Sequence, residues 1–206
     1  MITDLVVKVS LTGAGSVVMW FLVLLSIISL TLVIERWVFF MKNSGEASLL
    51  AQQIGGKLAS GELEAAQEIL KGENGYAATV VSAALEIAPK GKEAMSEMAQ
   101  SAAKVEKLRF EKGLAFLGTL GNNAPFIGLF GTVLEIIAAL SEMGSNSGGQ
   151  VGATAVMSTL SAALAATAVG LLVALPAVAF YNYFSRRIKS LNTGAEALLH
   201  VVFANK

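Results

Sequence analysis

The sequence predicts an all-α integral membrane protein with three transmembrane helices and long helical extensions outside the membrane. Of its 206 residues, 54% are hydrophobic and only 15% are charged, whereas soluble domains carry about a quarter charged residues. No Lys or Arg occurs from Gly113 to Phe184, and the only acids there are Glu135 and Glu142. One span needs about 20 residues, so this stretch holds two helices and a short connection.

The first span is predicted over residues 17–40. Its centre carries no charge, and Trp20 and Trp37 are separated by about 26 Å along a helix. That spacing matches the two aromatic belts of a membrane. A cleaved signal peptide is the alternative. The segment is too long for one and lacks a basic n-region and a small-residue cleavage site.

Residues 41–112 are predicted to form a helical domain, because nine basic and ten acidic residues lie between Lys42 and Lys112. Ser60 is a candidate cap for a short amphipathic helix that ends at Gly72. A second helix is expected over about 76–87. A third begins near Lys92, meets no breaker before Gly113 and can continue straight into the next span.

The second span is predicted over residues 113–143 and the third over 151–184. A glycine-rich turn at 144–150 joins them, and a tail follows at 185–206. Pro125 and Pro176 fall inside the two spans, where neighbouring helices can satisfy the freed carbonyls.

The basic residues predict the orientation. Nine Lys and Arg lie in residues 41–112 and four in the tail, against one in the N-terminal segment 1–16 and none at 144–150. The positive-inside rule then places the N-terminus and the turn outside, which in a bacterial inner membrane is the periplasm, and the large loop and C-terminus in the cytoplasm.

The third span is rich in small residues. From Gly152 to Ala179, 17 of 28 residues are Gly, Ala, Ser or Thr. Small residues let helix backbones approach closely, and hydroxyls bond across helices. Since one three-span subunit cannot bury such a helix alone, we expect a homo-oligomer around a central axis.

Three polar residues of the spans are candidates for an ion pathway. Thr132 and Thr167 each lie among small residues, and their hydroxyls can line an ion path or simply bond to their own helix. Glu135 lies three residues after Thr132, and an ionisable group at membrane depth suggests function, unless it sits wet at the interface. Glu35 and Arg36 are expected to form a structural interfacial pair.

Other classes of function find little support. There is no cysteine and one histidine, His200, so no metal site is expected. Equal numbers of acids and bases give nucleic acid no electrostatic attraction. No phosphate loop or catalytic triad occurs, so we do not expect an enzyme or a cofactor. The glycines at 118, 121, 128 and 131 are spaced for helix packing.

Three motifs resemble the ExbB/TolQ/MotA family of ion-driven motor (stator) subunits, and the ExbB/TolQ branch most. They are APFIGLFGTV at residues 124–133, SAALAATAVGLLVALPA at 161–177, and IER at 34–36. They occur in the family's order and span most of the chain.

The resemblance implies a homopentamer with a central pore, built around a dimer of a single-span partner of the ExbD/TolR type. An Asp of that partner carries H⁺ or Na⁺, and residues matching Thr132 and Thr167 face it. Ion flow then drives work in the cell envelope. The matching helix residues are Pro125, Gly128 and Gly131 on the second span and Gly170 and Pro176 on the third.

The sequence departs from ExbB and TolQ at two positions. A Glu usually found five residues before the third-span threonine is Ala162 here, and Glu135 stands where ExbB has Gly. Our hypothesis is that Glu135 replaces the missing acid, or that another ion is used. A Na⁺-driven or gliding system stays open. A non-conducting membrane scaffold is the main alternative. A secondary transporter is disfavoured by the absence of inverted repeats.

Overall fold

The computed structural model describes residues 15–145 and 151–204. Within these ranges the chain forms seven α-helices and one 3₁₀ helix, with no strand. Three helical stretches are long and apolar enough to cross a membrane: one begins at Ser16, one covers Leu114–Ser141 and one begins at Thr159. The predicted all-α, three-span membrane fold is therefore confirmed. Most of the predicted segment 1–16, most of the turn at 144–150 and the end of the tail lie outside the described residues.

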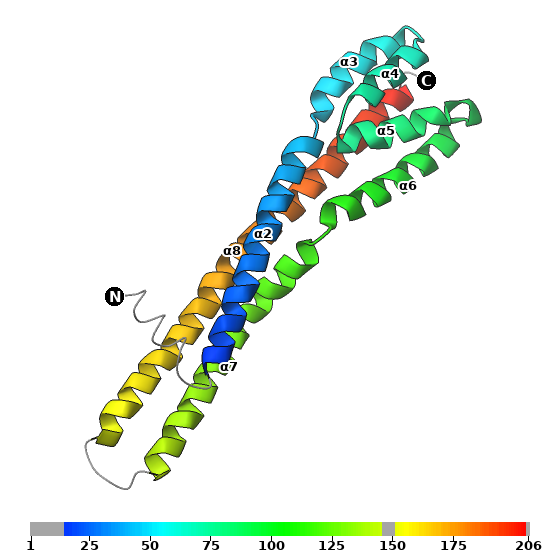
Figure 1. The fold of residues 1–206 in the computed structure, drawn as a ribbon. Coiled ribbons are helices and arrows are strands. Elements are labelled where there is room, and N and C mark those ends of the chain that lie inside the picture. The colour runs from blue at the N-terminus through cyan, green and yellow to red at the C-terminus, as the bar shows by residue number, and fades with distance from the viewer. Residues whose placement is uncertain (1–14, 146–150, 205–206) are drawn as a thin grey trace. The chain divides into compact units, whose positions relative to one another are not determined.

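The chain divides into two compact units. The first, residues 1–33 and 115–182, contains the start of α2 (Gly15–Asn43), nearly all of α7 (Leu114–Ser145) and the first part of α8 (Val151–Ala204). These three helices run alongside one another (Figure 1). One core cluster joins them, made of Val18, Leu22, Leu120, Ala124, Val173, Ala174 and Ala177. Large apolar side chains also cover their outer faces, as a lipid-facing surface requires.

The second unit, residues 34–114 and 183–206, contains the end of α2 and the end of α8. Between them in sequence come α3 (Ala47–Ala59), α4 (Leu63–Gly72), α5 (Tyr76–Glu86), the 3₁₀ helix η1 (Ala88–Lys90) and α6 (Lys92–Glu111). Aromatic rings form its centre. Tyr76, Phe110 and Phe184 are fully buried, and the Phe110 ring packs edge-on against Phe40 at 5.1 Å and Tyr76 at 5.5 Å between centroids.

Tyr76 also anchors the polar part of this core. Its hydroxyl lies 2.9 Å from the Ala103 carbonyl oxygen and 3.0 Å from Asn192 Oδ1. Burial, followed by the charge of Glu106, raises the pKa of Tyr76 to about 12. The neutral phenol is therefore the form that fits the folded unit.

The structure differs from the sequence prediction at two helix ends. Ser60 does not cap the helix that follows it. It ends α3 instead, and its hydroxyl donates to the Gly56 carbonyl 3.0 Å away. The helix that begins at Lys92 does not continue into the second span either. It stops at Glu111, and Gly113 takes a left-handed φ of +79° before α7 begins. Glycine adopts this conformation without the penalty of a side chain.

The third span and the tail form one helix. α8 runs for 54 residues from Val151 to Ala204 with Pro176 inside it. It passes through Phe184, where the span was predicted to end, without a break.

Candidate functional site

A close approach between α7 and α8 is built from glycines. A methyl group on Gly128 would lie 2.8 Å from the Ala166 carbonyl oxygen and 3.0 Å from the Thr167 Cα. A methyl group on Gly170 would lie 2.7 Å from the Ala124 carbonyl oxygen. Only hydrogen fits at either position, so the two backbones pack directly on each other.

α2 joins this contact at Gly131. A methyl group there would lie 3.1 Å from both the Ala166 Cβ and a methyl of Val18. Gly131 therefore marks the level at which all three helices of the first unit meet. Val18 and Ala166 carry no polar group, so the sequence offered no signal that they belong to this junction.

Thr167 has the least expected environment of the predicted site residues. Its Oγ1 is buried and has no hydrogen-bond partner within the described part of the chain. A helical threonine usually satisfies its hydroxyl on a carbonyl of the preceding turn. Leaving such a group unpaired in an apolar interior costs about 1–3 kcal/mol. The hydroxyl thus stays available to another group.

Thr132 behaves in the ordinary way. It is buried, and its hydroxyl donates to the Leu129 carbonyl oxygen at 2.6 Å. It lies four residues beyond Gly128 on the same face of α7, about one turn further along the helix. Gly128 lies directly against Thr167, and Thr132 lies one turn further along α7.

Glu135 continues the same face of α7. It is 5% exposed and lies three residues beyond Thr132. The Glu135 side chain is therefore buried within its own subunit. A charged group at the centre of a span costs about 2.5–3.5 kcal/mol. The side chain of Ala162, the other position at which the sequence departs from the family resemblance, is not among those described.

The two prolines lie inside the helices, as the sequence predicts. Pro125 is half-buried in α7, one residue after the Ala124 carbonyl that faces Gly170, and Pro176 is exposed on α8.

Glu35 and Arg36 lie in the other unit and form an ion pair with each other. Arg36 is 3% exposed and also donates to the Arg109 carbonyl oxygen, 3.3 Å away in the last turn of α6. Its guanidinium lies 4.6 Å from the centre of the Phe39 ring. Arg36 therefore connects the end of α2 to the end of α6. No sequence signal pointed to Arg109, because 73 residues separate the two positions.

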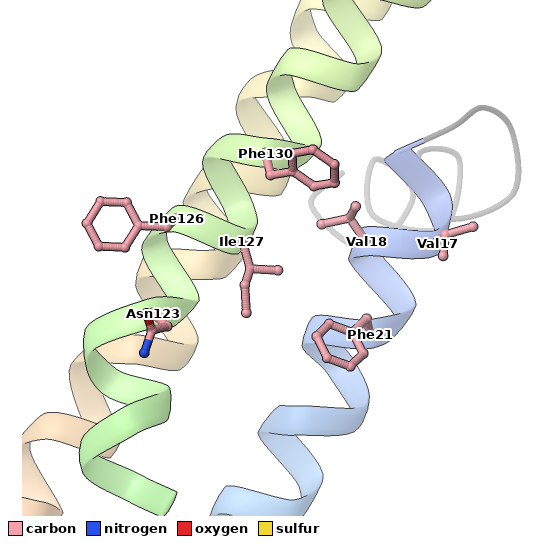
Figure 2. Close-up of a pocket in the computed structure, with 7 residues that line it drawn as sticks. All are labelled: Val17, Val18, Phe21, Asn123, Phe126, Ile127 and Phe130. Atoms are coloured by element: carbon pink, nitrogen blue, oxygen red, sulfur yellow. The ribbon is translucent and has the colours of Figure 1, made fainter.

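An apolar pocket of about 420 Å³ opens between α2 and α7. Figure 2 shows Phe21 on α2 and Phe126 and Phe130 on α7 around it, with Asn123 at one end. The Asn123 amide donates to the Thr119 carbonyl oxygen at 2.7 Å. No group of three or more His, Cys, Asp or Glu side chains gathers as a metal site in residues 15–145 and 151–204.

These features define a three-span, all-α membrane protein whose second and third spans pack through glycine around buried hydroxyl and carboxyl groups. Residues 66–197 match the MotA/TolQ/ExbB proton channel family. The match covers more than half of the chain, and the protein belongs to this family.

Relatives place the chain on the ExbB/TolQ side of the family. It is 38% identical over 135 residues to "Biopolymer transport protein ExbB" of Neisseria gonorrhoeae, covering 66% of this chain and 60% of the relative. It is 42% identical over 96 residues to "Putative biopolymer transport protein ExbB-like 2" of Helicobacter pylori, covering 47% of this chain and 63% of the relative. The chain thus spans about three fifths of the length of these curated relatives. Family and apolar helices together support a bacterial inner-membrane protein.

Proposed function

We propose that this chain is the ion-conducting subunit of a motor driven by the proton- or sodium-motive force. The motor transmits energy from the inner membrane to components of the cell envelope. Five copies surround a dimer of a single-span ExbD/TolR-like partner, whose membrane Asp carries the ion. Family membership and the ExbB relatives support this class of function.

The unpaired hydroxyl of Thr167 is the observation that carries the proposal. A buried hydroxyl with no partner in its own subunit can be satisfied by a carboxylate, a water or a cation supplied from outside that subunit. The adjacent Gly128 leaves no side chain in the way. In the proposed complex, Thr167 and Thr132 line the path on which the partner's Asp exchanges its ion.

Glu135 is proposed to replace the acid that the ExbB/TolQ resemblance leads us to expect at the position of Ala162. It is buried on the same face of α7 as Thr132, where a carboxylate can hold a proton or a sodium ion. The test is Glu135→Gln in the complex with its partner. We expect the pH dependence of ion-driven work to change. An unchanged pH profile at full activity would show that Glu135 is structural and that the chain uses a different coupling device.

The homopentamer can be tested by mass. Native mass spectrometry of the purified complex should give five copies of this chain and two of the single-span protein. A monomer or a dimer as the intact species would contradict the proposed arrangement, because the small-residue stretch of α8 would then face lipid.

The proposed orientation places the second unit in the cytoplasm. Since the chain has no cysteine, Lys71→Cys on α4 gives a single labelling site. A membrane-impermeant maleimide should label it only after the cells are permeabilised. Labelling in intact cells would mean that the second unit lies outside the cytoplasm, opposite to the proposed orientation.

A non-conducting scaffold is the second candidate, and one observation favours it. The Thr132 hydroxyl is satisfied within its own helix, and glycine packing alone gives a stable bundle. The variant with both Thr132→Val and Thr167→Val distinguishes the two. A scaffold should assemble and act normally, whereas a motor should assemble and lose its ion-driven work.

A further inference from the structure

A small groove of about 190 Å³ opens in the second unit, between the ends of α2 and α8. Its floor is formed by the buried rings of Phe40 and Phe184, 5.0 Å apart between centroids. Its wall is formed by Trp37 and Tyr183, which stack at 5.4 Å with an angle of 17° between their planes. Trp37 is 43% exposed and Tyr183 is 49% exposed. The groove therefore presents a continuous aromatic surface.

The groove lies where the apolar spans end. Trp37 directly follows Glu35 and Arg36, which end the uncharged stretch of α2, and Tyr183 lies near the end of the uncharged stretch of α8, three residues before Arg186. Exposed Trp and Tyr at such positions mark the headgroup level of a bilayer. Lipid headgroups are thus the molecules that meet this groove in the membrane.

The rim of the groove carries positive charge. Arg187 lines it, and neither Arg187 nor its neighbours Arg186 and Lys189 form an ion pair or hydrogen bond within the described part of the chain. The next acid along α8 is Glu196, about 13 Å beyond Arg187, and its carboxylate accepts from Asn192.

The polar groups of α2 near the groove offer no partner to Arg187. Glu35 is paired with Arg36. The Ser44 hydroxyl on the rim donates to the Phe40 carbonyl oxygen at 2.6 Å. Arg187 is exposed and has no counter-charge within the described part of the chain, so its guanidinium is open to an anion from outside the subunit.

We propose that this groove binds an anionic glycerophospholipid such as phosphatidylglycerol. The Arg187 guanidinium pairs with the lipid phosphate, because its planar fork matches phosphate oxygens. The start of an acyl chain lies against Trp37 and Tyr183. A free phosphate or an acidic peptide would satisfy the charge and leave the aromatic wall uncovered. The inference depends on the chain spanning a membrane and not on ion conduction.

Tryptophan fluorescence tests this site in the full chain. The protein contains two tryptophans, so Trp20→Phe leaves Trp37 as the only one. The variant is reconstituted in liposomes of phosphatidylcholine with a fraction of brominated lipid, whose bromines lie near the carbonyl end of the acyl chain. We expect brominated phosphatidylglycerol to quench Trp37 more strongly than brominated phosphatidylcholine with the same chains.

Two arginine variants make the test specific. Arg187→Gln should lower the preference for phosphatidylglycerol by more than about tenfold, the change expected when a charge-assisted hydrogen-bonded pair with the phosphate is lost. Arg186→Gln is the matched control, because it removes the same charge from the adjacent position, which does not line the groove. It should lower the preference by no more than about fivefold, the effect of one basic charge at the membrane surface.

Three results would overturn the proposal. Equal quenching by both lipids would mean that there is no headgroup selection. Equal effects of the two arginine variants would mean a diffuse surface charge and no site. If neither lipid quenches Trp37, another protein copy or partner covers the groove.

Discussion

Gly170→Ala tests the glycine contact between α7 and α8. The added methyl would lie 2.7 Å from the Ala124 carbonyl oxygen and 3.1 Å from the Gly128 Cα, against at least 3.4 Å for ordinary contact. To restore that contact, α8 must move away from α7 by about 0.7 Å, which forfeits a quarter to a half of each nearby dispersion contact. All the opposing atoms belong to backbone, so no side chain can rotate aside.

The magnitude follows from these distances. Overpacking costs about 1–3 kcal/mol, and a backbone clash belongs at the upper end, about 3 kcal/mol. Replacing glycine by alanine in a helix stabilises the folded state by about 1 kcal/mol through helix propensity. The free energy of unfolding should therefore fall by about 2 kcal/mol, measured by titrating micelles with a denaturing detergent while circular dichroism follows the helix content.

Gly56→Ala is the matched control. Gly56 lies inside α3, and an added methyl would have no neighbour within 4 Å. Only the gain in helix propensity remains, so this variant should be as stable as the wild type or more stable by up to about 1 kcal/mol. If Gly170→Ala were as stable as Gly56→Ala, the direct backbone contact described above would be wrong.

Three further predictions concern the second unit. Arg36→Met should lower the free energy of unfolding by about 1–3 kcal/mol, because it removes a charged hydrogen bond to the Arg109 carbonyl. Chemical denaturation measures this loss, and an unchanged midpoint would contradict the link between α2 and α6. Tyr76→Phe should remove an ionisation near pH 12 from the absorbance titration of the tyrosines. Since that folded-state pKa lies above the unfolded value of about 10, the phenol's stabilising contribution should be complete below pH 10 and disappear as the pH rises towards 12; a Tyr76 that titrates near 10 would refute its burial. Gly113→Ala should lower the free energy of unfolding by about 1–2 kcal/mol, because alanine is strained at the left-handed φ of this position. Thermal unfolding measures this loss, and no loss would mean that α6 continues into α7.

The spans could be predicted because the bilayer imposes a length and a polarity that any sequence must meet. The run without Lys or Arg from Gly113 to Phe184 required two helices, and the small residues of the third span required close packing. The helix break at Gly113 escaped prediction because the sequence on either side favours helix. A glycine is tolerated inside a helix as well as at its end, so the sequence alone could not show that the helix stops at Gly113.

The candidate site was only partly predictable. The three-residue spacing of Thr132 and Glu135 is enough to predict that they lie on one face of α7. Spacing within a helix cannot give the register between two helices, so the contact of Gly128 with Thr167 could not be derived. The same limit applies to Arg36 and Arg109, which meet through tertiary packing alone.

Ion flux through the reconstituted complex is the most direct test of the proposed role of Thr167. The chain and its single-span partner are placed in liposomes, and H⁺ and Na⁺ entry are followed with ion-sensitive dyes under an imposed potential. Wild type and Thr167→Ser, which keeps a hydroxyl, should conduct one of these ions, while Thr167→Val should assemble normally and lose most of the flux. Equal flux in all three proteins, or none in any assembled complex, would contradict an ion path through this buried hydroxyl.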